Sequence, residues 1–131
     1  MFSIGHVAKA TGVKVPTIRF YEQEGLLPSP ARTQSNRRIY ADADIRRLTF
    51  IRHTRTLGFE LEDIRALLDL ADNPHRPCCE ADEIARRQLQ VVEERLRQLT
   101  ALKAELVRIN SACSGGKIAG ECRVIEALAG A

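Results

Sequence analysis

The stretch that decides the fold covers residues 81–111 and reads ADEIARRQLQVVEERLRQLTALKAELVRINS. As a single helix it would be about 45 Å long, at 1.5 Å per residue. Its apolar residues alternate at spacings of three and four, which is typical of a coiled-coil seam. The alternative is an amphipathic helix packed on its own domain, but the preceding segments offer no core large enough to cover it. The seam residues are Leu89, Val92, Leu96, Leu99 and Leu106, with Lys103 at the one polar position.

Three of the four cysteines are candidate metal ligands: Cys78 lies before this stretch, and Cys113 and Cys122 lie after it. A rod of about 45 Å would keep Cys78 away from the other two within one chain. Antiparallel pairing with a second copy would instead bring Cys78 of one chain beside Cys113 and Cys122 of the other. Three thiolates suit a soft divalent ion, while zinc usually takes a fourth ligand. We therefore predict a shared metal site, the alternative for each cysteine being an inert buried thiol.

Two residues near Cys78 are additional candidate ligands. Cys79 follows it directly, and neighbouring side chains diverge, so Cys79 is predicted to be a bystander, an alternative ligand or a redox partner. His75 lies three residues before Cys78 and is the one histidine close enough in sequence to complete the coordination. The glycine-rich segment 113–122 contains no histidine.

The composition indicates an ordinary folded protein. A chain of 131 residues fits one domain, or a small domain with an extended dimerisation helix. Its 44% hydrophobic and 28% charged residues argue against disorder. The sequence has no recognisable signal peptide and no apolar run near 18 residues, so we expect a cytoplasmic protein whose cysteines are thiols rather than disulfides.

The charge is unevenly distributed. Residues 1–55 contain ten Lys and Arg against four acidic residues, a net charge of +6, whereas residues 56–131 carry −3. A basic first half is typical of a nucleic-acid-binding head joined to another module. The alternative is a solvated basic face, and charge alone does not separate the two.

Two short helices are expected in the first 25 residues. Ser3 is a suitable N-cap for a helix that ends at Gly12, and Pro16 suits the first turn of a second helix that stops near Gly25. This arrangement is the helix-turn-helix pattern, whose second helix enters the major groove of DNA. Arginine offers bidentate donors to phosphates and base edges. The candidate DNA-binding residues are Thr17, Arg19, Tyr21, Arg38 and Tyr40, with a core role as the alternative for Tyr21.

A hairpin and two further helices are expected between these two helices and residue 81. Residues 28–35 should form a loop, and residues 36–40 one arm of a short hairpin. A third helix should start at Asp42 as its cap and break at Leu57-Gly58-Phe59. A fourth, with apolar residues from Leu61 to Ala71 at helical spacing, should end at the proline-containing segment 73–77.

Taken together, these motifs resemble the MerR-type transcription regulators, over essentially the whole chain. The matching segments are Ile4–Gly12, Thr17-Ile18-Arg19-Phe20-Tyr21-Glu22-x-x-Gly25-Leu26-Leu27, Asn36-x-Arg38-Ile39-Tyr40, Ile51-Arg52 and Leu57-Gly58-Phe59-x-Leu61-x-x-Ile64.

The resemblance implies a mainly α fold with a winged helix-turn-helix head, linking helices and a long antiparallel coiled-coil dimerisation helix. Arg19 would lie on the recognition helix, with Tyr21, Arg38 and Tyr40 as its DNA-contacting companions, while the role of Arg37 stays open. We expect a head with linking helices (1–72), a hinge (73–80), the dimerisation helix (81–111) and a metal-binding loop with a short C-terminal helix (112–131).

The resemblance also narrows the choice of metal ion that the cysteines would bind. Divalent-metal sensors of the family have a cysteine where Cys78 stands, and copper(I) sensors generally lack it. The segment from Cys113 to Cys122 is most similar to that of cadmium- and lead-responsive members, and its spacing is similar to that of mercury-responsive members. Zinc sensors tend to add a histidine or a second cysteine in this loop. We therefore expect Cd²⁺ or Pb²⁺ first, and Hg²⁺ or Zn²⁺ after them.

The expected function is that of a homodimer on promoter double-stranded DNA that distorts the DNA when metal binds, so that RNA polymerase transcribes heavy-metal resistance genes. The nearest alternative is a regulator of the same fold that senses thiol oxidation through its four cysteines. A cysteine-nucleophile enzyme lacks a recognisable histidine–acid pair, and a metal-storage protein would ignore promoter DNA. We expect no enzymatic activity.

Overall fold

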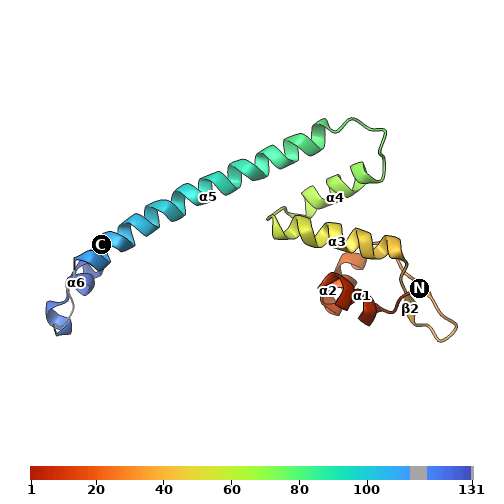
Figure 1. Cartoon of the computed structure of the whole chain (residues 1–131), viewed down its shortest axis with the longest axis horizontal. Coiled ribbons are helices and arrows are strands. Elements are labelled where there is room, and N and C mark those ends of the chain that lie inside the picture. Colours follow the sequence, from red (N-terminus) through yellow and green to blue (C-terminus); the bar gives the residue numbers. More distant parts are fainter. Residues whose placement is uncertain (113–117, 131) are drawn as a thin grey trace. The chain divides into compact units, whose positions relative to one another are not determined.

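The chain forms helices over most of its length, in a computed structural model that describes residues 1–112 and 118–130. It divides into two compact units, Met1–Ala85 and Arg86–Ala131. The first unit contains four helices, two short strands and the first residues of α5 (Figure 1). The second contains the rest of α5, a short 3-10 helix and α6. The elements are α1 (Ile4–Thr11), α2 (Val15–Gln23), β1 (Ala31–Arg32), β2 (Arg38–Ile39), α3 (Asp42–Thr56), α4 (Leu61–Ala71), α5 (Cys79–Ser111), η1 (Ala119–Glu121) and α6 (Arg123–Ala129).

The predicted helix-turn-helix is confirmed in α1 and α2. Ser3 caps α1, because its hydroxyl oxygen accepts a hydrogen bond from the His6 N–H at 3.2 Å. Gly12 ends α1 with φ +73°, a left-handed conformation that a side chain would strain. Pro16 lies in the first turn of α2, where its missing N–H costs no helical hydrogen bond. The two helices are therefore joined by a tight turn of three residues, 12–14.

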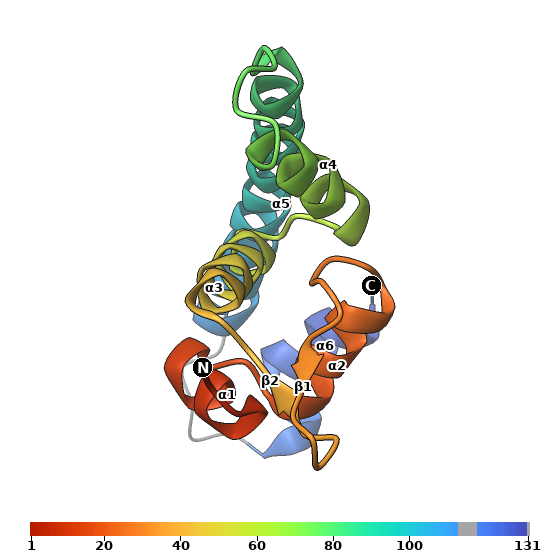
Figure 2. The same cartoon turned by 90° about the vertical axis from the view of Figure 1, so that its right-hand side faces the viewer.

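A short antiparallel hairpin follows α2. Strands β1 and β2 pair with Ala31 opposite Ile39 and Arg32 opposite Arg38 (Figure 2). The backbone of Tyr40 also pairs with that of Phe2, which fastens the base of the hairpin to the start of the chain. The expectation of loop for residues 28–35 was therefore wrong at Ala31 and Arg32. Two residues that closely follow prolines carry too little strand signal to be recognised without their partner.

The third and fourth helices have the expected apolar faces. Helix α3 begins at Asp42, but Ala41 rather than Asp42 is its N-cap, and the Ala41 N–H donates to the Asp44 carboxylate at 2.8 Å. Gly58, with φ +88°, turns the chain between α3 and α4. Helix α4 ends at Ala71, before Pro74, as predicted.

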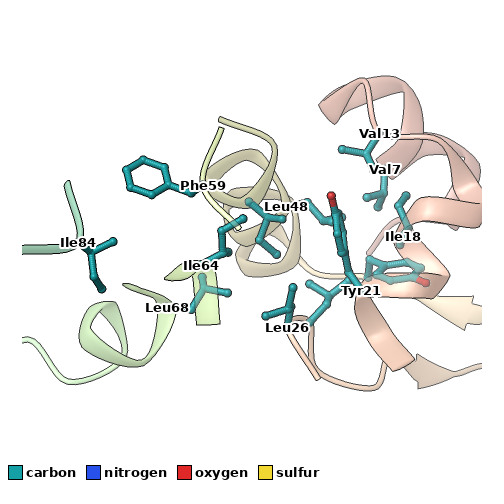
Figure 3. Packing of buried hydrophobic residues seen from close by; sticks show 13 residues of the cluster. Val7, Val13, Ile18, Tyr21, Leu26, Leu48, Phe59, Ile64, Leu68 and Ile84 are labelled. Carbon is teal, nitrogen blue, oxygen red and sulfur yellow. The ribbon is translucent and has the colours of Figure 1, made fainter. Parts of the chain in front are cut away.

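The core of the first unit is formed by one side of each of these helices. Val7, Ile18, Leu48, Ile51 and Ile64 are fully buried. Figure 3 shows this cluster extending through Leu26 and Leu68 to Ile84, in the second turn of α5. Burying an aliphatic side chain of this size contributes about 1.5–3 kcal/mol. The first turns of α5 are therefore part of the core of the first unit.

Helix α5 spans 33 residues and begins at Cys79, two residues before the expected start at Ala81. Beyond Ile84 its predicted seam residues are uncovered, with exposed fractions of 46–63% for Leu89, Val92, Leu96, Leu99 and Leu106. These five side chains are therefore not covered by other residues of the second unit, as far as the structure describes it. None of the described helices is both long and apolar enough to cross a membrane.

In the second unit, the end of α5 meets α6. Ile109 is buried, while Leu106 and Val107 of α5 and Val124 and Leu128 of α6 line an open apolar groove of about 650 Å³.

Candidate functional site

The residues predicted to contact DNA are positioned by α2 and the hairpin. Arg19 is exposed on α2, and Thr17, two residues nearer the start of that helix, is half-buried. Tyr21 is only 7% exposed and belongs to the core cluster. Arg19 is therefore the one predicted cationic contact on α2, and its side chain is open to a ligand.

The other two predicted contacts, Arg38 and Tyr40, meet Glu22 of α2. The Tyr40 hydroxyl donates a hydrogen bond to one oxygen of the Glu22 carboxylate. The other oxygen lies 3.3 Å from Arg38 Nε, which is buried and forms an ion pair without hydrogen-bond geometry. Tyr40 is 1% exposed. Two effects raise the pKa of its hydroxyl: burial, which is the larger, and the hydrogen bond to Glu22. The Glu22 carboxylate thus fixes the hairpin to α2, with Arg38 nearer the surface and Tyr40 buried.

A basic groove beside the helix-turn-helix was not predicted from the sequence. It measures about 420 Å³ and includes Thr17 and three cationic side chains, Lys14, Arg52 and Arg55. The Arg52 guanidinium packs over Gly12, where a Cβ would lie 3.3 Å from its central carbon. In the sequence these arginines contributed to the charge excess of residues 1–55, and Arg52 also to the family resemblance, but neither signal predicted the groove. Their position opposite the turn depends on how α3 packs against α1. The groove has the charge that suits a phosphate backbone.

The cysteines predicted as metal ligands lie at helix ends. Cys78 and Cys79 are exposed and Cys122 is half-buried, and none of the three is in a disulfide. The Cys78 carbonyl accepts the first helical hydrogen bond of α5, from the Asp82 N–H at 3.0 Å. Cys122 has the same role for α6, its carbonyl accepting from the Glu126 N–H at 3.0 Å. The prediction for Cys113 lies outside the described residues.

The described residues do not bring these ligands together within one chain. Over residues 1–112 and 118–130, no group of three or more His, Cys, Asp or Glu side chains is arranged to hold a metal ion. His75 and Cys79 are both exposed beside Cys78. The thiols themselves fit a thiophilic ion in kind, because they are not consumed in disulfides.

The segment that carries Cys78 is held by charged contacts. Arg76 Nη1 donates to the Asp69 carboxylate of α4 at 2.6 Å, and its Nη2 lies 3.5 Å from the Glu80 carboxylate of α5. Asn73 Nδ2 also donates to the Asp69 carbonyl at 2.7 Å. Cys78 is therefore placed on a loop that is tied to both the end of α4 and the start of α5.

Comparison with known proteins assigns this arrangement to a family. Residues 2–71 match the profile described as "MerR HTH family regulatory protein", and residues 45–109 match "MerR, DNA binding". The chain belongs to the MerR family. The resemblance found in the sequence motifs is confirmed, and the MerR assignment covers both the helix-turn-helix head and most of α5.

Several MerR proteins match over nearly the full length. The HTH-type transcriptional regulator ZntR of Escherichia coli K12 is 41% identical over 130 residues, covering 98% of this chain and 92% of ZntR. The mercuric resistance operon regulatory protein of Serratia marcescens is 39% identical over 128 residues, covering 98% and 88%. The crystal structure of the transcription regulator PbrR691 from Ralstonia metallidurans CH34, in complex with lead(II), superposes with a TM-score of 0.82 at 37% identity, covering 98% and 99%.

Proposed function

We propose that this MerR-family chain is a homodimeric regulator that binds promoter DNA and activates heavy-metal resistance genes when a thiophilic divalent ion binds. The observation that carries the proposal is the exposed apolar seam of α5, which lies between Cys78 and Cys122 in the chain. Of the similar proteins named above, the one from Serratia marcescens is named for mercuric resistance, and PbrR691 was crystallised in complex with lead(II). The lead(II) complex supports Pb²⁺, and the similarity of the segment from Cys113 to Cys122 to cadmium- and lead-responsive members is the reason to keep Cd²⁺ beside it, with Hg²⁺ and Zn²⁺ as the other ions.

The dimer is argued from the α5 seam. Leu89, Leu96 and Leu99 are each more than half exposed, and a run of apolar side chains at coiled-coil spacing is stable in water when a second helix covers it. An antiparallel copy of the same helix offers the same spacing in reverse. The seam thus predicts a symmetric pair of chains.

The metal site follows from this pairing. A straight helix of 33 residues is about 50 Å long, so Cys78 and Cys122 of one chain would be too far apart to share an ion. In an antiparallel dimer, Cys78 of one chain and Cys113 and Cys122 of the other would form each of two equivalent sites. An ion bound there joins thiolates from both chains in one coordination sphere. His75 and Cys79 stand beside Cys78 as additional candidates.

The DNA contacts are assigned to the head. Arg19 would enter the major groove with α2, and Thr17 would contact the DNA backbone beside it. The basic groove is suited to phosphates, and Arg38 would reach a phosphate from the hairpin. Tyr21 and Tyr40 are buried, so we propose that they act on the DNA through the residues they position. Metal binding would shift the two heads so that the promoter bends and untwists for RNA polymerase.

The test is complementation between two inactive variants. One chain carries Cys78→Ser and the other Cys113→Ser with Cys122→Ser, and each alone should bind no lead(II) at the shared site. After the chains are mixed and re-annealed, each heterodimer should regain one lead(II) ion, measured by titration and by metal analysis after gel filtration. If the sites lay within single chains, the mixture would bind no lead(II), and the shared site would be disproved.

A second experiment distinguishes the proposed metal sensor from a regulator that senses thiol oxidation. The wild-type chain bound to a duplex enriched from a random-sequence pool should change its DNA footprint with lead(II) and not with peroxide. A peroxide response without metal would favour disulfide formation among the cysteines instead.

A further inference from the structure

Arg47 of α3 connects the end of the recognition helix to the end of α4. Its Nε donates to the Leu26 carbonyl at 2.7 Å. Its Nη1 donates to both carboxylate oxygens of Asp72, at 2.9 and 3.2 Å. Asp72 is the C-cap of α4 and comes six residues before Cys78. One guanidinium therefore touches both the segment that follows α2 and the segment that leads to the proposed metal ligand.

The Leu26 end of this connection is firmly attached to α2. Gly25 turns the chain with φ +75°, and the N–H groups of Leu26 and Leu27 both donate to the Tyr21 carbonyl, at 3.0 and 3.3 Å. Leu26 and Leu27 are each only 1% exposed. A displacement of the Leu26 carbonyl must therefore be followed by the last turn of α2.

The Asp72 end is attached to the Cys78 loop. Arg76 bridges Asp69 of α4 and Glu80 of α5, so the loop is fastened to α4 at one end and to the start of α5 at the other. A movement of Cys78 towards a partner chain would be transmitted along this loop to the last turn of α4, where Asp72 lies.

The same corner has room for rearrangement. A pocket of about 230 Å³ is lined by Gly25, Leu26, Arg47, Arg65 and Asp72, together with Leu68 and Asp69. Arg65 of α4 makes a second link here, since its Nη1 donates to the Glu24 carbonyl at 2.5 Å and its Nη2 lies 3.5 Å from the Glu24 carboxylate. Both α3 and α4 thus hold the carbonyl end of α2 through arginines.

We propose that Arg47 and Asp72 are positioning residues that transmit occupation of the Cys78 site to the end of the recognition helix. This inference rests on the proposed metal response and adds the residues that couple it to the DNA-binding head. The Asp72–Arg47–Leu26 contacts give the coupling a route made of three hydrogen bonds within the first unit. Loss of the Asp72 carboxylate should uncouple the two ends without emptying either site.

The experiment measures backbone amide hydrogen exchange at Leu26 and Leu27 in the full-length protein, with and without saturating lead(II). In the wild-type chain lead(II) should change the exchange rate by about threefold or more, within the range of coupling that single residues carry. In Asp72→Ala the lead-induced change should fall below half of the wild-type value, with the lead(II) affinity unchanged. The Asp72 side chain is more than half exposed, so its truncation leaves the core intact.

The matched control is Glu62→Ala, another exposed carboxylate on α4 whose contact with Arg65 is at 4.0 Å. It should retain the full lead-induced change. A second variant, Arg47→Met, should abolish the change and make the further replacement of Asp72 without effect, as expected of two residues on one route. If Arg47→Met does not fold, comparison of the lead-induced exchange change in Asp72→Ala with that in Glu62→Ala still tests the positioning role.

The outcomes separate the two proposals. If the wild-type chain binds no lead(II), the proposed function fails and this inference fails with it. If it binds lead(II) but exchange at Leu26 and Leu27 is unaffected, or if Asp72→Ala retains the full change, the positioning role alone is disproved. A purely structural role for Asp72 would lower the melting temperature in both states and leave the lead-induced difference unchanged.

Discussion

Glu22 shows how a single carboxylate can position two residues that the sequence predicts to contact DNA. Its two oxygens face Tyr40 and Arg38, so one residue of α2 holds both residues of this segment that were predicted to contact DNA. The sequence predicts that these residues belong to the DNA-binding head, but it does not show which of them lies inside. That distinction depends on the Phe2–Tyr40 backbone pairing, which accompanies the burial of Tyr40 and leaves Arg38 partly exposed.

The Tyr40 hydroxyl should make stability depend on alkaline pH. Because burial and the Glu22 bond raise its pKa, the folded state holds this proton more tightly than the unfolded chain, whose tyrosine pKa is about 10. Its contribution is complete below pH about 10 and is lost as the pH rises further. Tyr40→Phe should cost about 1.5 kcal/mol at pH 7. It should also make the loss of stability above pH about 10 shallower by up to about 1.4 kcal/mol per pH unit.

Urea unfolding at one protein concentration, repeated from pH 7 to pH 11, measures both effects. A Tyr40→Phe variant with the wild-type alkaline slope would show that Tyr40 does not carry this titration.

At the scale of elements, α1 depends on one glycine and tolerates replacement of another. Gly12 has φ +73°, and a Cβ there would meet the Arg52 guanidinium at 3.3 Å. Gly5 lies inside α1 with ordinary φ, and its nearest neighbour would be the Ser3 hydroxyl at 3.9 Å. Gly12→Ala should therefore lower the free energy of unfolding by about 1–2 kcal/mol. Gly5→Ala should raise it by about 0.5 kcal/mol, because alanine loses less backbone entropy in a helix.

Thermal and urea unfolding of the two variants beside the wild type provide the measurement. The two changes in the free energy of unfolding need not be equal in size. A Gly12→Ala variant as stable as the Gly5→Ala variant would contradict the conformational argument. The Gly12 substitution should also weaken DNA binding, because the displaced Arg52 lines the basic groove.

Elements with a local signal were predictable and those that depend on pairing were not. The cap at Ser3, the stop at Gly12 and the seam of α5 each depend on residues close in sequence. Strand β1 has two residues and is defined by its partner β2. The groove containing Lys14, Arg52 and Arg55 likewise lies between segments far apart in the sequence, the turn 12–14 with α2 on one side and α3 on the other, so only its charge could be read from the sequence.

At the scale of the whole molecule, the uneven charge and the α5 seam should act together on DNA binding. Leu96 is 62% exposed, so Leu96→Asp should disturb dimerisation and not the fold of the chain itself. Sedimentation analysis should show a monomer at concentrations where the wild type is a dimer. Each phosphate contact contributes about −0.9 to the slope of log K against log salt concentration on a mixed-sequence duplex. The monomer, with one basic head, should show about half the wild-type slope.

Arg97→Ala is the control for this prediction. Arg97 is one residue away on α5 and forms an exposed ion pair with Glu94, a contact worth little to stability. This variant should remain dimeric with the wild-type salt slope. A monomeric Leu96→Asp chain with an unreduced slope would mean that one head makes all the phosphate contacts.

The uncovered leucines of α5 should also make the stability of the folded chain depend on its own concentration. A newly made chain carries this apolar stripe in water until it meets a second copy, and partner binding stabilises the folded chain more as its concentration rises. Chains made in small numbers would remain unpaired for longer, and unpaired chains are the ones that proteases and chaperones act on. Turnover would therefore remove the regulator fastest when it is scarce, which gives its cellular level a lower threshold set by the same side chains.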